Sequence, residues 1–204
     1  MRKLLPAVAL VVVSILGCNF DKPLVDPFSC EHDQRLFGTW NAPLSTSMKK
    51  DYLVIGKAWL QPDNGAPKGL MKSQRIELSQ DSKLGGDERF FVTTKIGDEN
   101  YAMFIDNNLV DYSIHKKFDF SKQKHFQIVK YRVTANELEI RQINLDEMSK
   151  VIKKGLLRGT LVDGESPVVT DSTENVIRFL KGGDSKNLFD DSGLVKARKY
   201  TREK

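Results

Sequence analysis

The sequence predicts a mainly β domain, an antiparallel barrel or sandwich, with two short α-helices in its C-terminal third. Up to eight short apolar runs are separated by turn-forming Gly, Pro, Asn and Asp residues, as in an antiparallel sheet. In several runs apolar and polar residues alternate, which fits strands with one face on a core and one in water. Two later segments instead have apolar residues at helical spacing between helix start and stop signals.

The first residues of the chain have the composition of an export signal. Arg2 and Lys3 precede an apolar run over residues 4–16. That run is shorter than the roughly 20 residues that a membrane-spanning helix needs. Its charged start, short apolar centre and small-residue exit predict a signal peptide over residues 1–17.

This leader ends in Ile15-Leu16-Gly17-Cys18. The order of a branched apolar residue, a second apolar residue, a small residue and a cysteine resembles the lipobox of bacterial lipoproteins. The resemblance implies cleavage between Gly17 and Cys18, a diacylglyceryl group on the Cys18 sulfur, and acylation of the new amino group, for example by palmitate. One acyl chain binds a membrane only marginally, whereas two or three anchor a protein stably. The alternative is an ordinary signal peptide with a cysteine close to its cleavage site.

The same resemblance implies a location and a first partner. The residue after Cys18 is Asn19 rather than Asp. In envelopes with two membranes, lipoproteins without Asp at this position usually go to the outer membrane. The protein is therefore expected in the cell envelope, on the outer membrane where there are two, held to the membrane by its N-terminal lipid.

The rest of the chain divides into two parts. Residues 18–29 hold two prolines and little periodicity, which predicts a lipidated N-terminus and an extended tether. Residues 30–204 are expected to form a single β-rich domain with a hydrophobic core. The whole chain has a net charge of +5. Loss of the leader lowers this value to about +3, a mild excess that is not typical of a nucleic-acid-binding protein.

The expected strands follow one another along the domain, with hairpin turns at residues 97–100 and 135–136. Residues 194–200 can add a last strand, and residues 106–119 give no clear prediction. The other runs with strand character are 36–40, 52–60, 69–80, 89–96, 101–105, 124–134, 137–143 and 156–162.

Two short helices are expected after these strands. Asn144 and Glu147 form a plausible N-cap pair and Gly155 is a suitable C-terminal stop, which predicts a helix over residues 146–154. A second helix is expected to start at Asp171 and to end before the glycines at 182 and 183.

Gly38-Thr39-Trp40 resembles the G-x-W motif in the first strand of lipocalins. The resemblance covers three residues, and it implies that the tryptophan closes the narrow end of a barrel, often against a late basic residue. Gly38 and Trp40 are therefore the expected barrel-closing core residues. The alternative is an ordinary antiparallel strand start, with glycine at a close approach and tryptophan in the core.

A broader resemblance covers most of the mature chain. The L-x-G-x-W start, the YLVIGKA, GLM…IEL and FFVT strands and the TDSTENVIRFL helix occur here in an order similar to that of uncharacterised bacterial lipoproteins and secreted proteins. This resemblance implies no known activity.

The cysteines and histidines do not predict a metal site. With Cys18 committed to lipid, Cys30 has no intramolecular partner and is expected to be a buried thiol, the alternatives being an intermolecular disulfide or a reactive thiol. Zinc sites need three or four ligands at recognisable spacings, whereas this chain offers only Cys30-x-His32 and the distant His115 and His125. No metal or cofactor is expected.

No catalytic residue is predicted either. The chain has no G-x-S-x-G nucleophile elbow and no Gly-rich phosphate loop. Glu137 and Glu139 would lie on one strand face at about 7 Å, as a carboxylate pair can. Arg141 continues the same row, so a charged outer face is the preferred interpretation.

Residues 115–132 interleave basic and aromatic side chains, as single-strand-binding grooves do. Strand alternation gives the same pattern when one face is core and the other solvent. Nucleic acid is not an expected partner of an exported protein, and acidic glycans or lipid head groups would suit such a surface better.

These observations favour a non-catalytic, lipid-anchored envelope protein. It would bind an apolar or amphipathic ligand, or act as an assembly or interaction partner of other envelope proteins. The alternative is an enzyme whose polar site is assembled from loops without a linear motif. An apolar cavity open at one end would favour the binding protein, and a cleft with convergent polar groups and shifted pKa values would favour the enzyme.

Overall fold

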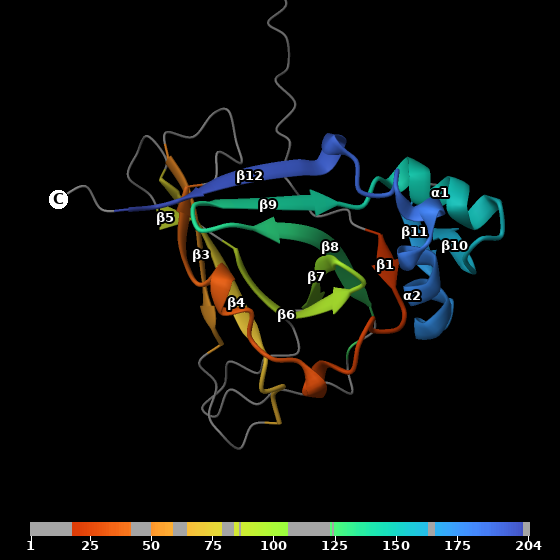
Figure 1. Cartoon of the computed structure of the whole chain (residues 1–204), viewed down its shortest axis with the longest axis horizontal. Helices are drawn as coiled ribbons and strands as arrows, with labels where there is room; N and C mark the ends of the chain where they lie inside the picture. The colour runs from red at the N-terminus through yellow and green to blue at the C-terminus, as the bar shows by residue number, and fades with distance from the viewer. Residues whose placement is uncertain are drawn as a thin grey trace, which may run out of the picture.

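The computed structural model describes residues 18–41, 50–58, 65–78, 84–85, 87–105, 123, 125–162 and 166–201. Its centre is a closed antiparallel barrel of eight strands, and two helices follow in the C-terminal third (Figure 1). The predicted fold class is confirmed. The barrel strands are β2 (Gly38–Asn41), β3 (Lys50–Lys57), β4 (Met71–Leu78), β6 (Glu88–Ile96), β7 (Glu99–Ile105), β8 (Phe126–Val133), β9 (Glu137–Gln142) and β12 (Leu194–Lys199).

The barrel strands are neighbours in chain order, so the barrel is an up-and-down meander. The helices and two further strands are inserted between β9 and β12. The ring closes where β12 pairs with β2, with Lys199 opposite Trp40. The short β5 (Leu84–Gly85) pairs with β4 outside this ring.

The two ends of the barrel differ. At one end β2 begins, and two-residue turns at Gly97-Asp98 and Ala135-Asn136 join β6 to β7 and β8 to β9. Gly97 has a φ of 62°, in the left-handed region that glycine adopts without strain. At the opposite end β9 leaves the barrel after Gln142 and β12 enters it at Leu194. The predicted hairpins at 97–100 and 135–136 are thus confirmed.

A small sheet extends from the side of the barrel. The C-terminal part of β8 pairs with β9, whereas its first two residues pair with β1 (Asn19–Phe20). Next to β1 lies β11 (Ser166–Val169), and β10 (Gly159–Val162) is the outermost strand. Figure 1 shows this sheet beside α1 and α2 on one side of the barrel. The sequence predicted β10 but neither β1 nor β11.

Residues 18–29 belong to the folded domain and do not form the expected tether. The Asp21 amide donates to the Val169 carbonyl at 2.9 Å, and the Leu24 amide lies 3.4 Å from the Met103 sulfur. Phe20 and Leu24 are each 2% exposed, because the outer face of the barrel offers an apolar surface that covers them. The domain described by the structure therefore begins at Cys18 rather than near Cys30.

Helix α1 (Leu145–Lys153) has the predicted ends. The Asn144 side chain accepts a hydrogen bond from the Glu147 amide at 3.1 Å, and Gly155 follows the helix with a φ of 71°.

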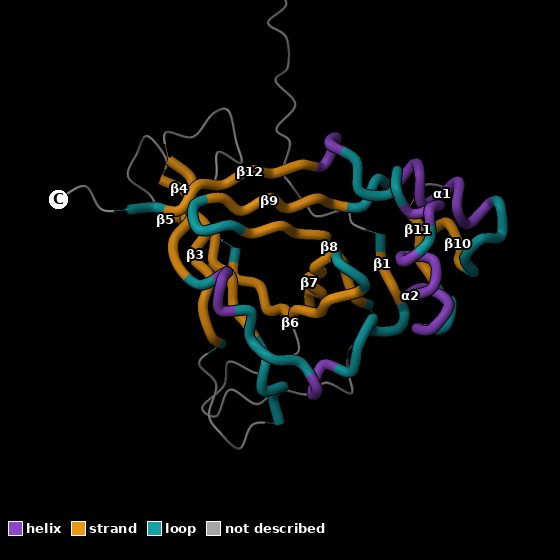
Figure 2. The backbone as a smooth tube through the Cα atoms, in the orientation of Figure 1, coloured by secondary structure: helices purple, strands orange, loops and turns teal. Residues whose placement is uncertain are grey.

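Helix α2 (Thr173–Lys181) is capped by Ser172 rather than by Asp171. The Ser172 hydroxyl accepts from the Asn175 amide at 3.3 Å. Asp171 instead accepts from the Arg158 and Ser172 amides and from the Asn175 side chain, and so joins the start of α2 to the chain before β10. Figure 2 shows both helices on the same side of the barrel. None of the described helices is long and apolar enough to cross a bilayer.

Two hydrophobic clusters share the strands β6, β7 and β8. One cluster, the interior cluster, fills part of the barrel interior. The other, which we call the outer cluster, packs the outer faces of these strands against the N-terminal segment and the helices. Both faces of the three strands are therefore buried, which explains their near-continuous apolar runs. The interior cluster comprises Leu36, Trp40, Ile55, Met71, Phe91, Ala102, Val129, Tyr131, Leu138 and Ala197.

Several expected boundaries move. β3 ends at Lys57, β4 begins at Met71, and β12 ends at Lys199. Residues 59–60 of the expected strand 52–60, residues 79–80 of the expected strand 69–80 and the undecided residues 106–119 lie outside the described residues, as does the expected leader.

Candidate functional site: the barrel cavity

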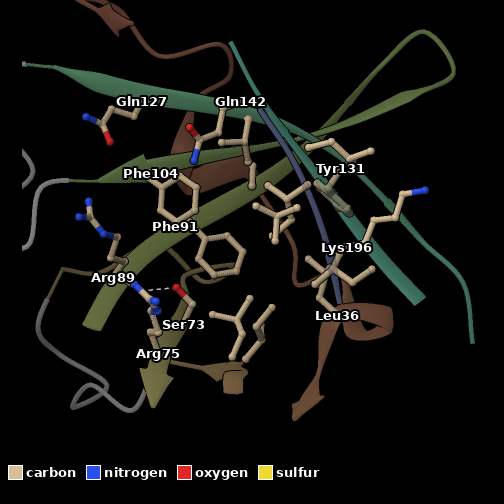
Figure 3. Close-up of a pocket in the computed structure, with 18 of the residues that line it drawn as sticks. Leu36, Ser73, Arg75, Arg89, Phe91, Phe104, Gln127, Tyr131, Gln142 and Lys196 are labelled. Atoms are coloured by element: carbon tan, nitrogen blue, oxygen red, sulfur yellow. Dashed lines mark hydrogen bonds between the residues drawn. The ribbon is translucent and has the colours of Figure 1, made fainter. Parts of the chain in front are cut away.

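The barrel encloses a cavity of about 580 Å³. Side chains from β3, β4, β6, β7, β8, β9 and β12 line it (Figure 3). Its volume lies within the range of about 300–1,000 Å³ that is usual for small-molecule sites.

Most of the cavity wall is apolar. Phe91 and Phe104 lie on adjacent strands with ring centroids 5.4 Å apart, and they form the centre of one wall (Figure 3). Both side chains point into the barrel, because the residues directly before and after them on their strands belong to the outer cluster. The other apolar lining residues are Leu36, Leu53, Ile55, Ala102, Val129, Leu138, Ile140, Leu194 and Val195.

One end of the cavity is occupied by the chain that enters β2. A single 3-10 turn (Gln34–Leu36) precedes this strand, and Leu36 lines the cavity. Trp40 is fully buried and donates from Nε1 to the Leu36 carbonyl at 2.8 Å. The Lys199 ammonium lies 5.3 Å from the centre of the Trp40 ring. A Cβ at Gly38, whose φ is 133°, would lie 3.3 Å from the Lys199 side chain.

A polar cluster fastens this turn to the barrel wall. The Tyr131 hydroxyl donates to Asp33 Oδ2 at 2.7 Å, and Arg35 donates to both Asp33 oxygens at 2.8 and 2.6 Å. Burial tends to raise the pKa of Asp33, but the hydrogen bonds from Arg35 and Tyr131 outweigh it and leave that pKa below its usual value. Burial and the Asp33 carboxylate raise the pKa of Tyr131, so its hydroxyl stays protonated and donates.

Polar side chains line the opposite end of the cavity. Arg89 and Gln127 lie there, far from Leu36 and Tyr131 (Figure 3). Arg75 also lines the cavity and donates to Asp51 Oδ2 at 2.9 Å, and the Asp51 side chain is only 2% exposed. The remaining polar residues inside this end are Ser73 and Gln142.

The cavity reaches the molecular surface at this polar end. Asp191 is part of the lining, and its side chain is 79% exposed and 3.3 Å from Arg141. Asp87 is also exposed. We call this end the mouth. Lys196 also lines the cavity, but it lies near Tyr131 and Leu36 (Figure 3), with its ammonium 3.6 Å from Glu139 on the outside of the barrel.

Cys18, the expected lipidation site, is the first residue that the structure describes. Its side chain is 1% exposed within the outer cluster, and burial raises its pKa far above the usual value. A diacylglyceryl group on this sulfur would not fit in the space that the Cys18 side chain occupies in the outer cluster. Attachment of lipid therefore requires Cys18 to leave the outer cluster.

Cys30 is a buried free thiol, as expected. Burial, and to a lesser extent the charge of Asp26, raise the pKa of Cys30 to about 11. A thiol with a raised pKa is a poor nucleophile at neutral pH.

The structure keeps the described histidines apart. His32 Nε2 lies 3.3 Å from the Leu70 carbonyl, whereas His125 pairs with Asp21 at 3.2 Å. Among the described residues no three His, Cys, Asp or Glu side chains form a metal-sized group, and His115 lies outside them.

The carboxylates of β9 face outward. Glu139, which is only 9% exposed, lies 3.5 Å from both Arg132 and Arg141. The interpretation of Glu137, Glu139 and Arg141 as a charged outer face is confirmed by this geometry.

The basic and aromatic stretch 115–132 is described only at 123 and from 125 onward. In that part Phe126 and Tyr131 are buried in the two clusters, so their rings do not offer a stacking surface. Strand alternation explains this part of the pattern.

The sequence analysis did not predict that Arg75 and Arg89 line the cavity. On β4, Met71, Ser73 and Arg75 are the residues that point into the barrel, so this strand places an arginine inside. Arg89 lies two residues before Phe91, so the two side chains are on the same face of β6. This spacing was the one signal in the sequence that an arginine points inward.

No protein-family model, no curated protein and no solved structure matches this chain.

Proposed function

We propose that this protein is a lipid-anchored protein of the cell envelope that holds an apolar or amphipathic ligand in its barrel. The supporting observation is the cavity of about 580 Å³, apolar along most of its length and polar at its mouth. Binding sites for small amphipathic molecules combine a mainly apolar wall with a few well-placed polar groups.

In this proposal Gly38 and Trp40 close the barrel. Trp40 fills the end opposite the mouth, fixed by its hydrogen bond to Leu36 and covered by the Lys199 ammonium. Gly38 leaves room for the Lys199 stem. A ligand then enters through the mouth.

The anchor is the second part of the proposal. The residues at 15–18 support cleavage after Gly17 and lipid attachment at Cys18. Because β1 begins at Asn19, no flexible tether would separate the lipid from the folded domain. The pairing of Asn19 and Phe20 with β8 and β11 would hold the barrel close to the membrane after Cys18 has moved out.

The chemistry of the cavity favours a binding protein over an enzyme. Of the described residues with a shifted pKa, only Tyr131 lines the cavity, and its hydroxyl is engaged by Asp33. The apolar cavity likewise favours a ligand carrier over a purely structural assembly partner, which would need no internal space.

Identification of a co-purified ligand tests the proposal. The mature chain, residues 18–204 with Cys18→Ser, is purified without detergent and studied by native mass spectrometry and lipid extraction. A bound amphiphile is expected in this protein. Ala102→Trp, which places a large ring in the cavity, should abolish its recovery, whereas Ala135→Trp in the exposed β8–β9 turn should not. Absence of any ligand, together with no binding of added lipids, would contradict the proposal.

A further inference from the structure

We propose that the ligand has an anionic head group, which Arg89 and Arg75 bind at the mouth while the apolar part lies along Phe91 and Phe104. This inference rests on the proposed function, because it assigns a ligand class to the same cavity. The class is an amphiphile with an oxyanion head, a carboxylate or a phosphate.

Arg89 is the principal head-group residue. It is half-buried on β6, two positions before Phe91, and it points into the barrel like Phe91. The head group of a ligand whose apolar part contacts the Phe91 ring therefore reaches the Arg89 guanidinium. Within the described part of the chain no side chain hydrogen-bonds or ion-pairs with this guanidinium. A cation in this position is stabilised when an anion binds beside it.

Arg75 adds a second, oriented cation. Asp51 accepts from its Nη2 at 2.9 Å and is itself buried, which fixes the guanidinium in one direction before a ligand arrives. Asp51 also balances the charge of Arg75. The excess positive charge inside the mouth is therefore that of Arg89.

Uncharged donors lie around the two arginines. Ser73 is opposite Arg89 across β4 and β6, and Gln127 and Gln142 line the cavity from β8 and β9. The lining carboxylates, Asp87 and Asp191, are exposed at the rim, where water and salt screen their charges. The interior of the mouth thus favours an anion, and the arginine fork matches the geometry of a carboxylate or phosphate.

A matched pair of fluorescent probes tests this inference on the mature Cys18→Ser chain. The probes are cis-parinaric acid and its methyl ester, which share an acyl chain and differ in the head-group charge. The acid should bind about tenfold more tightly, the ratio expected for a charge-assisted hydrogen bond. Displacement of the acid by laurate and by dodecyl phosphate then separates carboxylate from phosphate.

Arg89→Gln should remove most of the preference for the acid and leave the affinity for the ester unchanged, while Arg89→Lys should retain part of it. Arg198→Gln, on the exposed outer face of β12, is the matched control and should behave as wild type. Unchanged melting temperatures would show that these variants remain folded.

The possible failures are distinguishable. Equal affinity for acid and ester, with no effect of Arg89→Gln, would overturn the head-group inference and leave the proposed ligand binding intact. Binding of neither probe would overturn both.

Discussion

The Lys199 ammonium lies 5.3 Å from the centre of the Trp40 ring, so that the last strand of the barrel covers the buried aromatic residue of the first. Trp40 lies between this cation and the Leu36 carbonyl that accepts its indole N–H. The contact joins residues 159 positions apart in the chain, on the two strands whose pairing closes the ring.

The two residues of this contact should differ greatly in their contribution to stability. Trp40→Ala removes a fully buried side chain and should lower the free energy of unfolding by about 3–5 kcal/mol. Lys199→Met keeps the apolar stem and should cost no more than about 1 kcal/mol, the value of an exposed cation–π contact. Chemical denaturation measures both, with the exposed Lys196→Met as the control. Equal effects at the two positions would contradict this account of the closed end.

Asp33 should make the free energy of unfolding decrease as the pH is lowered into the acidic range. Its pKa is lower in the folded state than in the unfolded state, because Arg35 and Tyr131 donate hydrogen bonds to the carboxylate. Its stabilising effect is therefore present above its unfolded pKa of about 4 and is lost as the pH falls through the folded value.

In Asp33→Asn the slope of unfolding free energy against pH below about 4 should be shallower than in wild type. Glu137→Gln, at an exposed position of β9, is the control variant and should behave as wild type. Equal slopes for wild type and Asp33→Asn would show that the hydrogen bonds of Asp33 to Arg35 and Tyr131 do not contribute to the pH dependence of stability.

The N-terminal segment should behave as part of the core. Phe20→Ala is expected to destabilise the mature protein by about 3–5 kcal/mol, because the ring is almost fully buried against the outer face of the barrel. The exposed Phe28→Ala is the comparison and should change stability by less than about 1 kcal/mol. A wild-type stability for Phe20→Ala would restore the interpretation of this segment as a tether.

The sequence allowed the strands and helices to be predicted where local signals decide them. The Gly97-Asp98 and Ala135-Asn136 turns and the Asn144 cap depend on neighbouring residues alone. β1 and β11 were missed because their partners are distant in the sequence, and β11 includes Pro167, which argues against a strand.

The cavity was harder to predict than the barrel. On β6 both faces are apolar and buried, so alternation cannot tell which side faces the interior. On β4 the inward residues include Ser73 and Arg75, whereas the usual rule places polar side chains outside. Only the closed ring of strands shows that these residues share a space with Arg89.

The proposed lipid anchor makes a direct prediction for the native protein. Mass spectrometry of the protein extracted from its membrane should find an N-terminus at Cys18 with two or three acyl chains, and Cys18→Ser should be unlipidated and released from the membrane. Because the Cys18 side chain must leave the outer cluster on lipidation, Cys18→Ser should still fold and bind ligand. A mature N-terminus elsewhere would contradict the anchor.

The central claim is that the ligand lies inside the barrel, and methyl NMR of the mature Cys18→Ser protein during titration with laurate tests it most directly. We expect shifts at Ile55, Val129 and Ile140, which line the cavity. The methyl groups of Ile96, Ile143 and Val176 in the outer cluster should stay unchanged. Shifts confined to the outer cluster, or no saturable shift at any methyl group, would contradict the account.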